Sequence, residues 1–301
     1  PLLFQKEIHI SSAQSDANKL LKKKERNNKR EKQKTTALKT TKPIVQFFPE
    51  GGDLVTGIEC VLGSKITDTE GNGLALGGKI LDHNGLVVSY FNSYEFGLGW
   101  TSIHVKPNTN YHLQIQIDGE MMMYPIPPAL LNGYALRIII WGEHIMITTS
   151  TTIANGLEGA LLIGHIRGNI IFKQTLKAND KNLNIIKLYT SKLQDGIAHF
   201  TLFAPNGEPV CERLIFIDNP KNDLKLLVTT DKPNYGLREK VNIDLNLGDT
   251  HGKPLNGDFS MSVCTQNDMQ EGVDNINSWL LLNSDLGGTI SNPNFFFQKE
   301  K

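Results

Sequence analysis

The sequence predicts an all-β protein: tandem antiparallel β-sandwich domains followed by a short helical C-terminal segment. Three observations predict this class. Apolar and polar residues alternate at a period of two in many short runs, as in strands with one buried and one solvated face. Turn residues separate these runs about every 8–12 residues, a spacing typical of sandwiches. The 301 residues also include 27 Gly and 13 Pro, as expected of a chain with many turns.

Chain length and changes in composition predict four parts. A chain of 301 residues can form two or three sandwiches of about 80–100 residues each. We expect an N-terminal strand and basic linker or insertion at 1–44, a first sandwich at 45–124, a second at 125–220, and a third at 221–301 that leads to a further domain. Because the chain starts with Pro1 and shows no signal peptide, we expect a fragment or processed piece of a longer protein. No apolar run approaches the length of a membrane-spanning helix.

A basic segment precedes the first expected sandwich. Between Lys19 and Lys42 there are eleven Lys and Arg residues and two acidic residues. The segment has no interleaved aromatic residues and no nucleic-acid fold beside it. We therefore interpret it as a solvated linker or exposed insertion and expect no nucleic-acid partner. The alternative is a weak electrostatic contact of the segment 19–42 with an anionic membrane surface.

The first expected sandwich opens with a short strand that ends at Pro49 and a turn at Gly51-Gly52. Turns with Asp and Gly at 68–71 and 82–85 separate the strands that follow. The expected strands lie at about 59–66, 76–81, 86–92, 101–105 and 111–117.

The second expected sandwich follows the segment 124–128, where three prolines predict a stiff junction. Turn residues at 203–210 predict a hairpin near the end of this sandwich. The expected strands lie near 135–141, 144–149, 160–165, 169–174, 185–188, 196–203 and 209–217. Residues 219–222 then join the second sandwich to the third.

The third part contains the clearest alternation in the chain. Every second residue from Val241 to Leu247 is apolar, turn residues follow at 249–254, and the alternation resumes at 259–263. We expect two antiparallel strands joined by this turn. Residues 276–286 then predict one or two helical turns, which the following two glycines stop.

The third part also resembles the macroglobulin domain, a β-sandwich module of alpha-macroglobulins and complement-like proteins. The matching residues are Asp231-Lys232-Pro233-x-Tyr235, then Arg238-Glu239-Lys240-Val241, then Gly252-x-Pro254 before Ser260-x-Ser262-Val263. The segment 97–111 is similar to a carboxypeptidase regulatory-like sandwich, in which a Gly-rich turn leads into a strand and then to a Pro and a Tyr.

Three landmarks, in this order, extend the resemblance over 45–297. They are Phe47-Phe48-Pro49-Glu50-Gly51-Gly52, then Cys211-Glu212-Arg213-Leu214-Ile215-Phe216 with Tyr235-x-x-Arg238-Glu239-Lys240-Val241, then Leu280-Leu281-Leu282-x-Ser284-Asp285-Leu286-x-Gly288-x-Ile290. Together they resemble extracytoplasmic proteins of Bacteroidetes-type bacteria with macroglobulin-like repeats. Many of those proteins continue into carboxypeptidase regulatory-like and TonB-receptor plug-like regions. The resemblance implies a non-enzymatic scaffold or interaction protein at the bacterial outer membrane, cell surface or periplasm. The implied partner is an outer-membrane complex such as a TonB-dependent transporter.

The apolar C-terminal segment is the expected partner-binding surface. Its apolar side chains have no evident partner in the rest of the sequence, so we expect another chain or a following domain to cover them. The candidate residues are Trp279, Leu280, Leu281, Leu282, Phe295, Phe296 and Phe297.

No residue pattern predicts catalysis. Alpha-macroglobulins trap proteases through a thioester in a Cys-x-Glu-Gln pattern, which none of the sequences at Cys60, Cys211 and Cys264 matches. The eight histidines form no H-x-x-x-H or H-E-x-x-H pair, and the chain has no G-x-S-x-G and no P-loop. We therefore expect no enzyme activity, no catalytic residue, no cofactor, no metal site and no small-molecule substrate.

Some residues leave alternatives open. The three cysteines are either buried small apolar residues or one disulfide with one thiol left over. Turn carboxylates at Asp53, Asp68, Glu70 and Asp82 could hold Ca²⁺, although such residues ordinarily accept hydrogen bonds from their own backbone. His104 and His112 could meet across a hairpin as metal ligands, although histidines on exposed faces are the ordinary interpretation.

Three other functions remain as alternatives to the scaffold. The first is a glycan-binding module with a sugar platform of Trp100, Tyr111, Trp141 and Trp279, for which core packing or burial in an interface is the ordinary interpretation. The second is a macroglobulin-like protein that interacts with proteases without a thioester. The third is an enzyme whose catalytic domain lies outside this chain.

Overall fold

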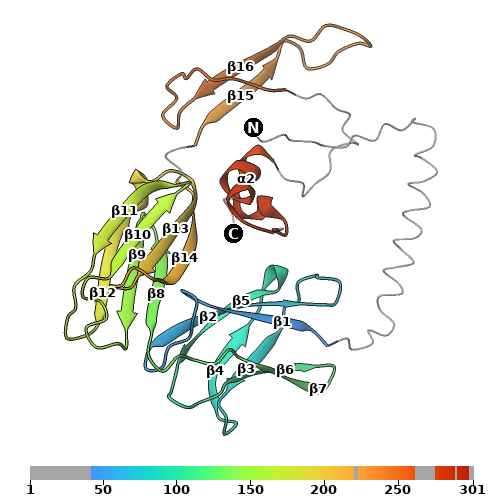
Figure 1. Cartoon of the computed structure of the whole chain (residues 1–301). Coiled ribbons are helices and arrows are strands. Elements are labelled where there is room, and N and C mark those ends of the chain that lie inside the picture. The colour runs from blue at the N-terminus through green and yellow to red at the C-terminus, as the bar shows by residue number, and fades with distance from the viewer. Residues whose placement is uncertain (1–41, 220–222, 262–274, 289, 298–301) are drawn as a thin grey trace.

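The structure, a computed structural model, describes residues 42–219, 223–261, 275–288 and 290–297 (Figure 1). It confirms the predicted all-β fold class. Two antiparallel β-sandwiches follow one another along the chain, and a β-hairpin and a short helical segment come after them. The strand expected near 7–10 and the basic segment up to residue 41 lie outside the described residues.

The elements of the first sandwich are β1 (Ile44–Pro49), β2 (Glu59–Thr67), β3 (Gly77–Leu81), β4 (Val87–Asn92), η1 (Glu95–Gly97), β5 (Leu98–His104), β6 (His112–Ile117) and β7 (Glu120–Pro125). A three-stranded sheet, β1-β2-β5, packs on a four-stranded sheet, β4-β3-β6-β7. Alternation along β2 places Cys60, Leu62 and Ile66 on its inner face. The turn between β6 and β7 has Asp118 at φ 49° and Gly119 at φ 87°, which matches a type I′ hairpin.

The elements of the second sandwich are β8 (Tyr134–Trp141), β9 (His144–Thr151), β10 (Leu161–Ile166), β11 (Asn169–Thr175), β12 (Leu183–Tyr189), η2 (Thr190–Lys192), β13 (Gly196–Phe203) and β14 (Pro209–Ile217). Its sheets, β8-β9-β12 and β11-β10-β13-β14, repeat the strand order of the first sandwich. The same seven-stranded arrangement therefore occurs twice in succession, as an immunoglobulin-type sandwich.

Each sandwich has its own hydrophobic core, and the two groups of buried residues do not overlap. In the second sandwich, Phe200 is fully buried and pairs with Gly164 on the neighbouring strand. A Cβ atom at residue 164 would lie 2.5 Å from the Phe200 ring, so glycine is needed there to make room for the ring. We infer that the two sandwiches are separate folding units joined at a junction.

The third part of the chain contains a hairpin of β15 (Lys225–Thr230) and β16 (Ile243–Gly248). The strand expected at 241–247 is β16. It pairs along its length with the preceding strand β15, which the sequence did not indicate, because alternation identifies the faces of a strand and not its neighbour. After the turn at 249–254, Pro254 forms an antiparallel bridge with Gly248, and the backbone N–H of Leu255 donates to Leu247 at 2.9 Å. The second strand expected at 259–263 lies partly outside the described residues, and its pairing stays a prediction.

The C-terminal segment contains α2 (Ile276–Leu281), η5 (Asn283–Asp285) and η6 (Pro293–Phe297), which confirms the expected helical turns. Asn275 begins the helix, because its side chain accepts a hydrogen bond from the backbone N–H of Ser278 while the Ser278 hydroxyl accepts one from the backbone N–H of Asn275. The helix then ends at Leu281, and the segment contacts both sandwiches through side chains described below.

The thiols of Cys60 and Cys211 are both buried and free, while Cys264 lies outside the described residues. For the first two residues, the structure confirms the interpretation as small buried apolar side chains. Burial raises the pKa of the Cys60 thiol, and it raises the pKa of Cys211 to about 12.

We predict that these two thiols resist modification in the folded protein. In a Cys264→Ser variant, a thiol-reactive chromophore at pH 8 should label neither cysteine until denaturant is added, because the thiolate is the reactive form. The folded Cys211 thiol holds its proton more tightly than the unfolded one. The free energy of unfolding should therefore fall as the pH rises from 9.0 towards 12. Rapid labelling under native conditions would contradict this prediction.

Candidate functional site

The junction between the two sandwiches is built from the turn that follows β1. Glu50, at the start of this turn, accepts hydrogen bonds from the backbone N–H of Ile138 and from Nε of Arg213, both at 3.1 Å. Gly51 forms a bridge with Glu212 on β14, whose backbone N–H donates to the Gly51 carbonyl at 3.2 Å. The first sandwich therefore pairs with backbone groups on the two edge strands β8 and β14, which would otherwise be unpaired.

Glycine is required at position 51 by this close approach. Gly51 has φ 89°, and a Cβ atom there would lie 2.9 Å from the backbone carbonyl oxygen of Leu136. The linker after β7 is also held, since the backbone N–H of Thr56 donates to Leu130 at 2.9 Å and the N–H of Leu130 donates to Leu54 at 2.8 Å. The linker is therefore held on the first sandwich, while the turn at Glu50 and Gly51 holds the first sandwich on the second.

A cleft of about 710 Å³ opens at this junction. One wall is the outer face of the sheet β1-β2-β5, and the other is formed by β8 and β14. The lining residues are Phe48, Pro49, Glu50, Gly51, Gly52, Val61, Gly63, Trp100, Arg137, Ile139, Glu212, Arg213 and Leu214. Its volume lies within the range of about 300–1,000 Å³ typical of ligand sites.

Two aromatic side chains stand on the wall contributed by the first sandwich. Phe48 pairs with Gly63, and Gly63 pairs with Trp100, so all three residues lie side by side on one face of the sheet. Phe48 is 53% exposed and Trp100 is 65% exposed. Because Gly63 has no side chain, the space between the two rings is open.

The charged side chains that line the cleft differ in whether they have a partner within the chain. Glu50 and Arg213 form an ion pair in which the carboxylate is largely buried. The Glu212 carboxylate lies 3.6 Å from Nδ1 of His199. By contrast, Nε of Arg137 is buried and has no hydrogen-bond partner in the described part of the chain. The half-buried Arg137 therefore lines the cleft as a cationic side chain without a partner among the described residues.

This set of side chains suits binding. Among the described lining residues there is no Ser, Thr, Cys, Lys or His that could act as a nucleophile. In the same described ranges, no group of three His, Cys, Asp or Glu residues is placed to hold a metal ion. The arrangement can hold an apolar or planar ligand that also carries a hydrogen-bond acceptor.

The candidate residues at the C-terminus lie apart from the lining of the cleft. Trp279 and Leu280 are exposed, and Leu281 is half-buried, whereas Leu282 is only 5% exposed and so is not available to a partner in this conformation. The three phenylalanines are half-buried. The partner-binding role of the segment stays a prediction.

The phenylalanines do have contacts within the chain, contrary to the expectation that only another domain or chain would cover them. Phe295 packs edge-on against Phe96 of the first sandwich at 5.3 Å between ring centroids, and Phe297 packs in the same way against Phe216 of the second, also at 5.3 Å. Nε of Arg167 forms an ion pair with Asp285 at 3.0 Å. The segment therefore contacts both sandwiches, through side chains whose pairing the sequence does not show.

The aromatic residues proposed as a sugar platform are divided by the structure. Tyr111 is buried, and its hydroxyl accepts a hydrogen bond from the Lys106 backbone at 2.9 Å. Trp100, Trp141 and Trp279 are 65%, 79% and 43% exposed, so these three residues are not packed in a core, and their burial in an interface stays a prediction. Only Trp100 lines the cleft, together with Phe48, whose role the sequence did not reveal.

The turn carboxylates are occupied by their own turns. Asp68 accepts hydrogen bonds from the Asn72 side chain at 2.8 Å and from the backbone N–H of Asn72 and Glu70, which lowers the pKa of its carboxyl group. Asp82 accepts from the backbone of Leu86 and Asn84, with the same effect on its pKa. Both residues accept hydrogen bonds from their own turns, as the ordinary interpretation expects, and their carboxylates are occupied there.

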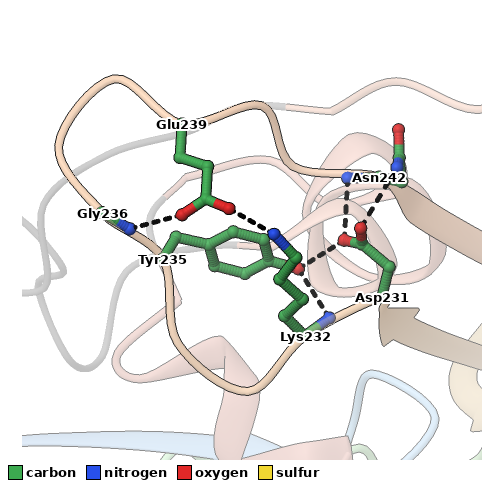
Figure 2. Close-up of polar contacts among 6 residues, drawn as sticks. All are labelled: Asp231, Lys232, Tyr235, Gly236, Glu239 and Asn242. Carbon is green, nitrogen blue, oxygen red and sulfur yellow. Dashed lines mark hydrogen bonds and ion pairs between the residues drawn. The ribbon is translucent and has the colours of Figure 1, made fainter.

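The residues of the macroglobulin-like motif form a network that shapes the loop between β15 and β16 (Figure 2). Asp231 accepts hydrogen bonds from the Tyr235 hydroxyl at 2.6 Å and from the backbone N–H of Asn242 at 3.1 Å. Lys232 pairs with Glu239, which in turn accepts from the backbone N–H of Gly236 at 2.7 Å. Apart from the half-buried Tyr235, the residues of the network are exposed, so hydrogen bonds and an ion pair organise the loop without a buried core.

We predict that Tyr235→Phe releases part of this network. The hydrogen bond from Tyr235 is the main cause of the lowered pKa of Asp231, followed by the bonds from Asn242. Removing the hydroxyl should therefore raise the pKa of Asp231 towards its ordinary value of 3.8, as measured by an NMR titration of its carboxyl carbon. In the wild type, the ionised Asp231 carboxylate helps to order the loop. This ordering should be lost as the pH falls through the lowered pKa of Asp231.

Asp249 provides the matched control for this titration. Its pKa is also lowered, but by backbone hydrogen bonds from Lys253 and His251 that do not involve Tyr235. The Tyr235→Phe variant should leave the titration of Asp249 unchanged. A shift of both carboxyl groups would show a general disturbance of the hairpin.

The strand order defines this chain as a tandem immunoglobulin-type sandwich protein, and the cleft at the junction of the two sandwiches is its candidate site. No family model matches the chain, and no curated protein matches it. Among the described residues, no helix is long and apolar enough to cross a membrane.

Several solved structures share limited similarity with the chain. The native E. coli alpha-2-macroglobulin matches 70% of this chain and 17% of its own, with 14% identity and a TM-score of 0.22. Domains 4–9 of the surface layer protein SbsC match 71% of this chain and 38% of theirs, with 12% identity and a TM-score of 0.29. The E. coli adhesin FdeC matches 71% of this chain and 76% of its own, with 12% identity and a TM-score of 0.21. This chain thus covers less than a fifth of the alpha-2-macroglobulin. Because all these TM-scores are low, the fold is assigned here from the strand order and not from these proteins.

Proposed function

We propose that this chain is a non-enzymatic, extracytoplasmic interaction module that binds its partner in the cleft between its first two sandwiches. The observation that carries the proposal is the cleft itself. Exposed apolar side chains from both sandwiches, Phe48 and Trp100 on one wall and Ile139 on the other, face a space closed by the Glu50 contacts. Exposed apolar surface gathered in a concave site marks a place of binding.

The location and the kind of complex rest on the sequence resemblance alone. We place the chain in the envelope of a Bacteroidetes-type bacterium, as a macroglobulin-like scaffold in an outer-membrane complex such as one with a TonB-dependent transporter. Trp279 and Leu280 would form a second contact, since both side chains are exposed.

The test is a comparison of what three versions of the full chain retain from detergent-solubilised envelopes. Ile139→Asp places a charge in the cleft, and Ile170→Asp places the same charge on β11, where the side chain is 63% exposed and lies outside the cleft lining. We expect one envelope component to be retained by wild type and Ile170→Asp and lost from Ile139→Asp. Equal retention by both variants would contradict the proposal. Loss of the same component on removing 276–301 would show whether the C-terminal segment contributes.

A further inference from the structure

Resting on this proposed function, we infer that the cleft is a site for a saccharide that carries a carboxylate. A sugar ring would lie against Phe48 and Trp100, and its carboxylate would pair with Arg137. The inference names the ligand class, which the proposed function leaves open.

Two exposed aromatic rings line the wall that the first sandwich contributes. Phe48 and Trp100 are separated by one residue, Gly63, across three paired strands, so their Cα atoms are about 10 Å apart. Neither ring stacks on another aromatic ring within the described residues, and both are more than half exposed. Large aromatic side chains are mostly buried in folded proteins, so two free rings facing one open space indicate a ligand with apolar faces.

The cleft presents apolar groups on one wall and polar groups on the other, which suits a sugar ring. A pyranose ring presents C–H groups on its faces and hydroxyl groups around its edge. The cleft has the matching arrangement, with aromatic rings over a glycine floor and the polar side chains of Arg137, Glu212 and Arg213 on the opposite wall. Glu212 and Arg213 have partners within the chain, but an entirely apolar ligand would leave Arg137 without one, which is unfavourable once water is displaced.

Arg137 is a charged residue of the lining that has no anionic partner among the described residues. Nε of Arg137 is buried without an acceptor, and the Arg137 side chain forms no ion pair in the part of the chain that the structure describes. Glu50, the largely buried carboxylate of the lining, is already bound to Arg213 and to the Ile138 backbone. A guanidinium pairs most strongly with a carboxylate or phosphate, so the site lacks one anion.

A peptide strand is the less favoured occupant. Gly63 lies on β2, which is the central strand of its sheet and is paired on both sides by β1 and β5. The backbone groups at the floor of the cleft are therefore already used, and a peptide could not extend this sheet there by main-chain hydrogen bonds. A peptide ligand is kept as an outcome of the test.

The experiment measures binding of the full 301-residue chain to an oligogalacturonate and to its methyl ester by calorimetry. The ester keeps the sugar rings and removes the negative charge. We expect wild type to prefer the acid, Trp100→Ala to weaken binding of both ligands about tenfold, and Arg137→Met to weaken only the acid about tenfold, so that the preference is lost. Trp141→Ala is the control, because Trp141 is more exposed than Trp100 and lies outside the cleft lining.

Three results would overturn the inference: equal affinity of wild type for acid and ester, an equal loss with Trp141→Ala and Trp100→Ala, or no binding to the oligogalacturonate or to an array of other acidic saccharides. The envelope-retention test separates this failure from that of the proposed function. If a protein or peptide component depends on Ile139 while no acidic saccharide binds, the cleft is an interaction site and the saccharide inference is wrong. If nothing depends on Ile139 and no acidic saccharide binds, both are wrong.

Discussion

Replacing Glu50 with alanine is expected to loosen the junction between the first two sandwiches and to lower the free energy of unfolding by about 1–3 kcal/mol. The Glu50 side chain is only 10% exposed, and one of its oxygens accepts from both the Ile138 backbone and Arg213. Alanine would leave the Ile138 N–H on the edge of β8 without a protein partner and the Arg213 charge without its carboxylate. Denaturant unfolding would measure the loss of stability, and small-angle X-ray scattering would detect a wider range of arrangements of the two sandwiches.

The control for this change is Glu212→Ala. Glu212 sits across the same junction, but its side chain is 56% exposed and only its backbone forms the bridge to Gly51. We expect its replacement to change the free energy of unfolding by less than about 0.5 kcal/mol, as for most surface substitutions. An equal effect of the two variants, or an unchanged scattering curve for Glu50→Ala, would show that the junction does not depend on the Glu50 contacts.

Loosening the junction by Glu50→Ala should also weaken ligand binding, because the cleft exists only while the two sandwiches keep their arrangement. Phe48 and Trp100 belong to one sandwich, and Arg137 and Ile139 belong to the other. A ligand that touches both walls would bind more weakly to Glu50→Ala even though none of the other lining residues has changed. Affinity should therefore fall along with the rigidity of the junction.

Much of the fold could be predicted from the sequence, because alternation and turn chemistry are local properties. The run 144–149 was expected to be a strand, and β9 shows alternating burial along its full length. The turn residues at 203–210 were expected to form a hairpin, and Ala204 and Gly207 do make its backbone hydrogen bonds. Both signals lie within a few residues of the structure that they predict.

The candidate cleft could not be predicted, because it depends on contacts between distant residues. Glu50 meets Arg213 across 163 positions of the chain, and no local pattern reports that meeting. Trp100 was named in the alternative sugar platform, but its place beside Phe48 could not be predicted, for a different reason. The strand was expected to begin at residue 101, whereas β5 begins at Leu98, so the sequence did not assign Trp100 to either face. The segment 47–52, which contains Phe48 and Glu50, contributed only to the family resemblance and gave no sign that it lines a cleft.

Replacing Phe200 with alanine is expected to have the largest effect of any change considered, a loss of about 3–5 kcal/mol. Phe200 is 0% exposed, and its ring fills the space that Gly164 leaves open on the neighbouring strand. Alanine would leave a cavity that the glycine cannot fill, in addition to the lost burial of the ring. Because a domain is typically stable by only about 5–15 kcal/mol, the second sandwich should melt at a much lower temperature.

The first sandwich should respond far less, which makes the experiment a test of the two separate cores. None of the residues in the core of the first sandwich belongs to the core around Phe200. Calorimetry of Phe200→Ala should therefore show one transition moved to lower temperature and one nearly in place, with hydrogen exchange assigning the first to 134–217. Ile185→Ala, at a position 61% exposed on β12, should move neither transition appreciably. A single transition that moves as a whole would mean that the Glu50 junction couples the two sandwiches into one unit. In that case Glu50→Ala should divide it into two transitions.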